Sequence, residues 1–488
     1  MRDVRRYNTP GSWEHAVRTH LVSGDRFCGL FARPTTNAVG LRALFDCNGE
    51  LDAEELTVGR EVGRYPSLGS VTPAAKWYER EIYDLFGLRA VGNTDHEPLV
   101  TSLRFAEPEP RGGPPQVGVA DDGSRGDSFV IPYGPVRSGV FESIEYLVCT
   151  IGEDIEWIKP RVLFKHRGMQ TRVEGVSLDD AVLVAERTEG VSSVAHAMAF
   201  SQAVEQITGS DIPVPAALVR VIHAELERVA NHLESTIRHT EAAGQAVAYA
   251  TLSQHKEQVQ RLRSRLCGSR FGRSVVVPGG VVGAPRLGPD ELRHAIDGLG
   301  RSIEADLRRL VDTPSFIDRL RGTGVLPLEL VRRFGALGPV ARGSGVPDDV
   351  RVTRPYGAYP MLGRLLVEYP HDGDALARQY VRSREIATSF HLIRQATEQL
   401  GGFSSRDERS WRHSVVLGDG EATGWVEAPQ GELLYLVESG NGVIRFVKSR
   451  SASFHNLALF ASAFPKDVFT DFAFIEASFG VSIAGVAS

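Results

Sequence analysis

Four polar side chains whose types could do chemistry lie close together in one stretch of the chain. They are Arg187, Glu189, Ser192 and His196. A guanidinium, a carboxylate, a hydroxyl and an imidazole side by side could bind an ion or transfer a proton. The same residues also fit a buried amphipathic helix with one hydrogen-bonded histidine. Composition alone favours this second, structural interpretation.

A predicted helix positions these side chains, which stand at or near its start. Ala195, Met198, Ala199 and Ala203 recur at helical spacing, so the helix has a narrow apolar face. Because alanine side chains are small, we expect another stretch of backbone to pack closely against this face.

The order of residues in this stretch resembles the first metal-binding motif of nickel–iron hydrogenase large subunits. That motif is Arg-x-Cys-Gly-x-Cys, followed by a helix of small residues with an early histidine. Arg187, Gly190 and His196 match it, whereas Glu189 and Ser192 stand where the two cysteines would be. The stretch is also similar to the large hydrophilic subunit of respiratory complex I, which has the same fold and no metal.

The end of the chain resembles the second half of such a metal site. Residues 477–479 match those that precede the Asp-Pro-Cys-x-x-Cys motif, but Gly480, Val481, Ser482 and Gly485 replace its Asp, Pro and both Cys. Nickel and iron in such centres are held by soft thiolates. The resemblance therefore implies that this chain binds no metal and argues against a working hydrogenase.

A third stretch, HRGMQ, resembles the family string His-Arg-Gly-x-Glu. His166, Arg167 and Gly168 match, while Gln170 replaces a Glu that is thought to pass protons in hydrogenases. An amide is not an acid, so Gln170 cannot take that role.

Complex I relatives use the vacated metal space for quinone, which they contact through a Tyr and a His. These positions align with Gly190 and Ser138, so neither head-group donor is present. Whether quinone binds this chain stays open.

The resemblance also implies an electron-transfer partner. Arg187 matches an arginine that lies beside the terminal iron–sulfur cluster of a partner subunit, and Arg273 is its possible companion. An alternative is that Arg187 forms an ion pair with Glu189 that only fixes the loop. We predict no catalytic residue and no metal ligand, and the binding residues we predict are Arg187, Arg273, His166, Arg167, Gln170 and Glu189.

The first part of the chain carries a separate signature, WYEREIYDLFG. It closely resembles the smaller hydrophilic subunit of complex I and the matching domain of formate-hydrogenlyase-type hydrogenases. Residues 73–88 are predicted to form an amphipathic helix that ends at Gly87. The resemblance implies that this helix lies at an interface with the large-subunit part.

These observations predict an α+β fold in two parts. Residues 1–104 form a small α/β domain, the Pro/Gly-rich stretch 105–131 is a linker, and residues 132–488 form a mainly helical domain with peripheral β-hairpins. Helical periodicity is clearest in residues 216–240, 245–266, 290–311 and 374–400. A β-hairpin is predicted after them, in residues 432–447.

Composition limits the partners. The net charge of −6 gives no reason to expect nucleic acid, and the four cysteines are too far apart in sequence for a CxxC pair. The N-terminus lacks the apolar core of a signal peptide, and no window has the ~20 apolar residues of a membrane span. We expect a cytoplasmic protein that is peripheral to the inner face of the membrane through partner subunits.

The sequence thus predicts a hydrophilic subunit of a membrane-associated oxidoreductase complex of the complex I or formate-hydrogenlyase kind. It would bind no cofactor itself and would dock an iron–sulfur subunit, in company with membrane antiporter-like subunits. The alternative is a structural scaffold of such a complex without a redox role.

Overall fold

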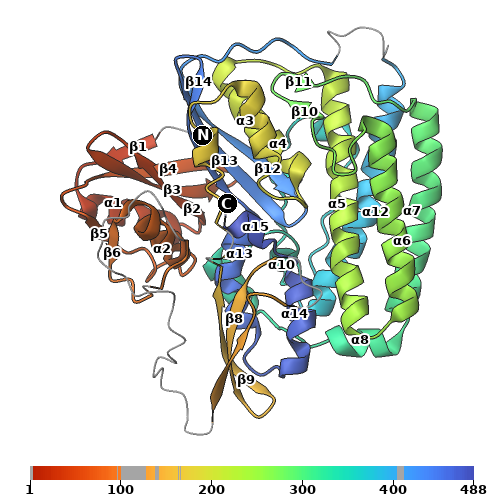
Figure 1. The fold of residues 1–488 in the computed structure, drawn as a ribbon, viewed down its shortest axis with the longest axis horizontal. Helices are drawn as coiled ribbons and strands as arrows, with labels where there is room; N and C mark the ends of the chain where they lie inside the picture. The colour runs from red at the N-terminus through yellow and green to blue at the C-terminus, as the bar shows by residue number, and fades with distance from the viewer. Residues whose placement is uncertain are drawn as a thin grey trace.

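The computed structural model describes residues 4–95, 97–100, 128–137, 142–162, 164, 166–403 and 411–487. A small β-rich part lies on one side, a three-stranded sheet lies in the middle and long parallel-running helices lie on the other side (Figure 1). The mixture of helices and several small sheets confirms the predicted α+β class. Most of the expected linker falls outside the described residues, and the domain boundaries stay a prediction.

The N-terminal part is a four-stranded sheet with two helices. Thr9 caps the first helix by accepting a hydrogen bond from the amide of Ser12, and Gly87 ends the second in the left-handed conformation, with φ +71°. The strands run in the order β1-β4-β3-β2. The elements are β1 (Val4–Tyr7), α1 (Pro10–Val22), β2 (Arg26–Pro34), β3 (Ala38–Cys47), β4 (Glu50–Gly59), β5 (Arg64–Pro66), α2 (Ala75–Phe86) and β6 (Arg89–Val91).

The four predicted long helices are confirmed and pack into a bundle (Figure 1). They are α5 (Val214–Ala242), α6 (Ala246–Cys267), α7 (Pro289–Val311) and α12 (Ala375–Leu400). Among the described residues, no helix is both long enough and apolar enough to cross a membrane. The shorter helices are α3 (Leu178–Ala185), α4 (Ser193–Thr208), α8 (Pro314–Leu320), α9 (Leu328–Phe334), α10 (Gly338–Arg342), α11 (Val350–Thr353), α13 (Ala452–Phe460), α14 (Phe472–Phe479) and α15 (Ile483–Val486).

Helix α5 differs from the expectation of a single apolar stripe. Its polar side chains Glu225, Arg228 and His232 are buried as completely as its leucines. The reason is its central position, because α5 packs against α6, α12, α14 and β11. Tertiary packing therefore encloses a face that the sequence pattern would place in solvent.

The predicted hairpin near residue 440 is also confirmed. Asn441 and Gly442 have φ of +55° and +73°, which fits the tight turn of a two-residue hairpin loop. Gly424 on the neighbouring strand approaches α4 so closely that an added Cβ would lie 1.7 Å from the carbonyl oxygen of Ala199. This is the close backbone contact expected of the alanine face. The strands here are β7 (Phe129–Tyr133), β8 (Glu145–Ile151), β9 (Asp154–Arg161), β10 (Val276–Val277), β11 (Gly280–Val281), β12 (Gly420–Ala428), β13 (Gly431–Gly440) and β14 (Val443–Arg450).

Helix α2, the signature segment, lies at the interface between the two parts of the chain. Both carboxylate oxygens of Glu81 lie 2.7 Å from Nζ of Lys448 on β14. The hydroxyl of Tyr78 lies 2.8 Å from Nδ1 of His455 on α13, and Trp77 packs edge-on against an aromatic ring of α13. The expected interface role of this helix is confirmed within the chain.

Candidate functional site

A cavity of about 480 Å³ opens between α5, α6 and two loops from distant parts of the chain. One loop contributes Gly190 and Val191, which belong to the first motif (residues 187–196). The other contributes 480–483 of the C-terminal segment (residues 480–487). The fold therefore brings together the two stretches that the sequence compares with the halves of a metal site.

The positions aligned with the missing cysteines meet beside this cavity. A Cβ added to Gly485 would lie 2.8 Å from Oε1 of Glu189. The Ser453 hydroxyl donates to that oxygen over 3.4 Å and accepts from the Ser482 amide over 3.0 Å. Ser192 is fully buried, and its hydroxyl donates to Oε1 of Gln430 over 2.7 Å.

His196 is the hydrogen-bonded core histidine that composition predicts. Its Nε2 lies 3.1 Å from Oε2 of Glu189, and its Nδ1 lies 2.6 Å from the hydroxyl of Tyr435 on β13. All three side chains are buried. This chain of contacts ties the first motif to α4 and to the central sheet.

These residues do not fit a nickel–iron centre. The four positions supply a carboxylate, two hydroxyls and a glycine, whereas such a centre needs soft thiolates. The Glu189 carboxylate also fills the space that any side chain at Gly485 would need, and its oxygens are already engaged by protein donors. We therefore derive no reaction step at a nickel–iron centre from these residues.

Arg187 does not pair with Glu189, so that part of the expectation was wrong. Its Nη1 lies 2.6 Å from Oε1 of Glu186 and 2.6 Å from the carbonyl oxygen of Leu183. The side chain is 48% exposed, whereas Glu189 is 2% exposed and turns inward to His196. These two loop residues, separated by Thr188, therefore face opposite environments, which the sequence could not distinguish.

Arg273 lies on the wall of the cavity. Its guanidinium stacks over the ring of Phe271, and its Nε has no hydrogen-bond partner among the described residues. Glu186 links this loop to Arg187, because its second carboxylate oxygen accepts from the Ser274 amide over 2.7 Å. The two arginines that the sequence proposed as companions thus belong to one neighbourhood.

Arg167 holds the two loops together from behind. Its guanidinium donates to the carbonyl oxygens of Arg187 and Thr188 in the first motif and of Ala484 in the C-terminal segment. Partial burial lowers its pKa from the ordinary value. Its contacts are those of a structural clamp.

His166 and Gln170 lie away from the cavity. Burial lowers the pKa of His166, whose nearest charges are Glu81 and Lys448 of the interface. Gln170 lines a separate hollow of about 130 Å³ against α2 and β14. The structure therefore divides the six predicted residues between the cavity rim, the loop clamp and the interface.

Three further positions need separate comment. Gly190 lines the cavity but has no side chain to donate a hydrogen bond, and Ser138 lies outside the described residues. His223 on α5 is buried, and its Nδ1 has no partner among the described residues. Burial and the nearby Arg263 lower its pKa to about 3, so the ring is neutral.

Glu142 is a cavity residue that the sequence did not reveal. Its carboxylate accepts from the Ser482 hydroxyl over 2.9 Å and from the backbone amides of Ile483 and Ala484. Burial raises its pKa. It stands before β8 in a stretch that reads only as alternating strand residues, so no local signal marks it.

Ion pairs line most of the remaining wall. Arg137 makes a two-pronged pair with Glu476, and Glu227 lies 3.3 Å from Arg263. Nε of Arg263 has no partner among the described residues. Val191, Ala230, Phe271, Val481 and Ile483 add apolar surface among the charged and polar side chains of the wall, so the cavity suits an organic molecule with a polar head.

Two family models match the sequence. Residues 243–487 match the respiratory-chain NADH dehydrogenase 49 kDa subunit, and residues 50–113 match the 30 kDa subunit. The two matches follow one another along the chain in the order that the sequence analysis expected.

Similar proteins of known name cover about two thirds of the chain. The membrane-bound hydrogenase subunit alpha of Pyrococcus furiosus is 31% identical over 68% of this chain and 81% of its own length. An NADH-quinone oxidoreductase subunit of Anaeromyxobacter sp. (strain K) is 30% identical over 67% of this chain and 88% of its own. A carbon monoxide-induced hydrogenase of Rhodospirillum rubrum is 29% identical over 65% and 87%.

Proposed function

Because the chain belongs to the family of the respiratory-chain NADH dehydrogenase 49 kDa subunit, with a 30 kDa-type segment ahead of it, we propose that it is a metal-free subunit of a membrane-associated oxidoreductase complex. It docks an iron–sulfur partner subunit and lies on the cytoplasmic side, attached to the membrane through antiporter-like subunits. The relatives named as hydrogenase and as quinone oxidoreductase subunits support membership of such a complex.

The observation that carries the metal-free proposal is the contact between Glu189 and Gly485. One aligned cysteine position supplies a carboxylate, and the other has no room for a side chain beside it. His196 holds the carboxylate in place from the other side. The chain therefore stabilises the joined loops through hydrogen bonds where a metal centre would need ligands.

The rim of the cavity supports the docking proposal. Val191 and Phe271 are each 40% exposed, and the half-exposed Arg187 lies in the same neighbourhood through Glu186. Exposed apolar side chains beside an arginine are typical of protein interfaces. A guanidinium facing a cluster would tune its potential through charge and hydrogen bonds to sulfur.

The cavity itself supports binding of an acceptor of the quinone class. Its wall combines apolar residues with the guanidinium groups of Arg263 and Arg273. Such donors suit the carbonyl oxygens of a ring that the apolar residues enclose.

Purification from the native host, with identification of the accompanying subunits and clusters, tests the proposal. In the purified complex, Arg187→Lys keeps the charge but loses the planar fork. We expect it to shift the midpoint potential or the electron paramagnetic resonance signal of the nearest cluster. Arg309→Lys on α7, where the side chain is 79% exposed, is the matched control and should change neither.

An unchanged cluster signal in an intact Arg187→Lys complex would favour the second candidate function, a scaffold without a redox role. The observation behind that candidate is the ion pair of Arg187 with Glu186, which can fix the loop without a partner subunit. A purified complex with no iron–sulfur subunit would contradict the docking proposal altogether.

A further inference from the structure

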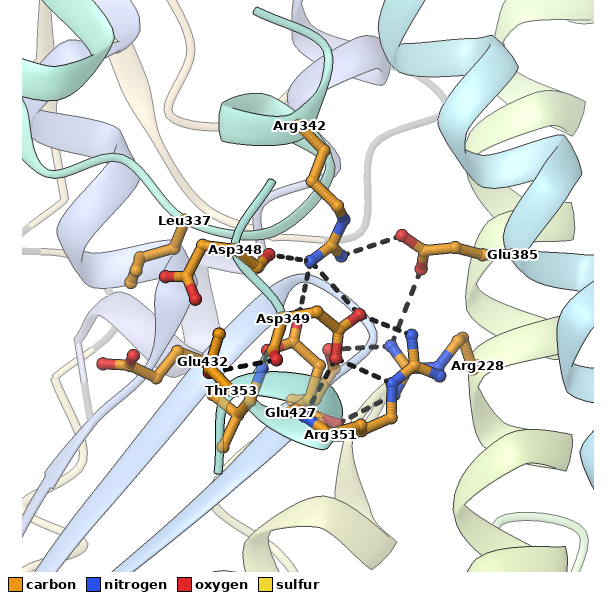
Figure 2. Close-up of polar contacts among 12 residues, drawn as sticks. Arg228, Leu337, Arg342, Asp348, Asp349, Arg351, Thr353, Glu385, Glu427 and Glu432 are labelled. Atoms are coloured by element: carbon orange, nitrogen blue, oxygen red, sulfur yellow. Dashed lines mark hydrogen bonds and ion pairs between the residues drawn. The ribbon is translucent and has the colours of Figure 1, made fainter. Parts of the chain in front are cut away.

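Seven charged side chains form a cluster inside the protein, where α5 and α12 meet β12 (Figure 2). We call this the interior cluster. Each member is less than a tenth exposed. The three arginines and four carboxyl residues are Arg228, Arg342, Arg351, Glu225, Asp349, Glu385 and Glu427.

Glu225 is fully satisfied as a carboxylate. It lies 3.1 Å from both Arg228 and Arg351, and it accepts hydrogen bonds from the hydroxyls of Tyr359, over 2.5 Å, and Ser389, over 2.7 Å. Burial raises the pKa of Glu225, but the positive charges of the two arginines lower it more, so that the pKa falls to about 2.

Asp349 and Glu385 also have strong partners. Arg351 reaches both oxygens of Asp349, over 2.7 and 3.0 Å. Glu385 Oε1 lies 2.8 Å from Nη2 of Arg342 as an ion pair without hydrogen-bond geometry, and its Oε2 lies 2.8 Å from Nε2 of His232. Despite burial, the neighbouring arginines lower the pKa values of both carboxyl groups.

Glu427 has weaker support. Among the described residues, its Oε2 accepts only from the Val350 amide, over 3.2 Å, and its Oε1 lies 3.0 Å from Nη1 of Arg342. That nitrogen has two hydrogens but three acceptors, because it also lies 2.7 Å from the carbonyl oxygen of Asp348 and 3.4 Å from Oδ2 of Asp349. Two carboxyl groups therefore compete for one guanidinium nitrogen.

The charge balance also indicates that one carboxyl group of the interior cluster is short of a cationic partner. Three guanidinium groups face four carboxyl groups, and an uncompensated charge in the interior is costly. Arg382 is a further buried cation, but it donates to the carbonyl oxygens of Arg378 and Phe479 and, among the described residues, not to a cluster carboxylate. Burial and the negative charge of Asp349 raise the pKa of Glu427 to about 8, although three arginines oppose this shift.

The interior cluster has an opening towards solvent. A crevice of about 10 Å³, which has room for about one water, is lined by Asp349, Arg351 and Glu385. At its rim lies the exposed ion pair of Arg384 and Glu368. The crevice therefore gives water access to Asp349 and Glu385, while Glu427 lies behind them.

The other end of the cluster approaches the cavity. His232 contacts Glu385, and its Nδ1 is buried without a partner among the described residues. Burial lowers its pKa to about 4, so it is neutral. Ser235 stands three residues further along α5, on the adjoining turn, and lines the cavity wall.

We propose that Glu427 and Asp349 share one exchangeable proton at Nη1 of Arg342, and that its gain or loss is transmitted to the cavity wall through Arg342, Glu385 and His232. The proton moves between water in the crevice and the Glu427–Asp349 pair through Asp349, which lines the crevice, and no other bond changes. The proposal stands on contacts within this chain and does not depend on docking or on quinone binding.

Infrared spectroscopy of the full chain tests the shared proton. A protonated carboxyl band should be present near ~pH 6 and lost with a midpoint near ~pH 8, and Glu427→Gln should remove it. Other buried acids such as Glu79, whose pKa is raised to about 7 by burial, also titrate, so the band is taken from the difference between wild type and variant. Glu329→Gln, which changes an exposed carboxyl on α9, is the matched control.

A second variant guards against misfolding of the first. Asp349→Asn keeps the α11 cap but removes the competing charge, so the Glu427 midpoint should fall by roughly a pH unit or more. A difference spectrum without a titrating band, or a midpoint unmoved by Asp349→Asn, would overturn the shared proton.

Nuclear magnetic resonance of nitrogen-labelled histidine tests the transmission. The His232 signal, assigned with His232→Gln, should shift with the same midpoint as the infrared band in wild type and stay constant in Glu427→Gln. A His232 signal that is constant in wild type would overturn the transmission to the cavity wall.

Discussion

Oε2 of Glu189 lies 3.1 Å from Nε2 of His196, and the two side chains are 2% and 1% exposed. The contact joins the loop before α4 to the helix itself, and the second ring nitrogen of His196 reaches Tyr435 on β13. Gly485 of the C-terminal segment packs against the same carboxylate. A hydrogen-bonded pair therefore organises the point where three distant parts of the chain meet.

Replacement of Gly485 tests how tightly this point is packed. Gly485→Cys should destabilise the protein by about 1–3 kcal/mol, the usual cost of overpacking, because the new Cβ would lie 2.8 Å from Glu189. Thermal unfolding measures the loss. Gly418→Cys is the matched control, since a Cβ there meets no atom within 4 Å. Glu189→Ala combined with Gly485→Cys should cost less than the sum of the single changes, and additive losses would contradict the contact.

Metal analysis gives a second prediction. The purified chain should contain no stoichiometric nickel, because Glu189, Ser192, Ser482 and Gly485 offer no thiolate. Elemental analysis that found about one nickel per chain would contradict the metal-free proposal.

The interface ion pair supports a third prediction. Glu81→Lys places two cations together where Glu81 and Lys448 are now each 6% exposed. Breaking a buried pair costs about 3–5 kcal/mol, so the N-terminal part should become sensitive to proteolysis. The charge swap, Glu81→Lys with Lys448→Glu, should restore most of the resistance. Glu14→Lys, in an exposed pair with Arg18, is the control. A swap as damaging as the single change would show that charge pairing is not what holds the interface.

The sequence predicted the long helices, the hairpin turn and the interface helix because each has a local signal. Helical periodicity, the Asn441-Gly442 pair and Gly87 act within a few residues of one another. The sequence also located the two loops that meet at the cavity, although only through resemblance. It could not predict that Arg187 turns outward while Glu189 turns inward, because partners 7 to 264 residues away decide this.

The interior cluster shows the same limit. In the sequence, Glu427 is only one polar residue of an alternating strand pattern, and Arg342 is only the last residue of a short helix. Their contact joins residues 85 positions apart, and Arg351 and Glu225 lie 126 positions apart. Only the packing of α5, α10, α12 and β12 determines that four carboxyl groups share three arginines.

The stability of the protein should depend on pH through Glu427. In the unfolded chain its carboxyl titrates near ~4.3, whereas burial beside Asp349 raises its pKa to about 8 in the folded protein. Between these values the folded protein keeps a proton that the unfolded chain has lost. The stabilisation is therefore full below ~pH 4 and is lost as the pH rises to about 8.

Carboxyl groups with lowered pKa values affect the stability of the protein in a different, more acidic pH range. Glu225 and Glu432, both lowered to about 2 by neighbouring arginines against the effect of burial, stabilise the fold above ~pH 4. Their contribution is lost as the pH falls towards 2. A change in stability between ~pH 5 and ~pH 8 therefore separates Glu427 from these groups.

Glu427→Gln imitates the protonated side chain at every pH. We expect its free energy of unfolding to match wild type near ~pH 4 and to exceed it increasingly above that, by a few kcal/mol near ~pH 9, because the wild-type carboxyl ionises in the unfolded chain from ~4.3 but in the folded protein only near about 8. Denaturant unfolding at a series of pH values measures the difference. Glu329→Gln should follow the wild-type curve throughout. A Glu427→Gln curve parallel to wild type from ~pH 5 to ~pH 9 would show that Glu427 is already ionised in the folded protein.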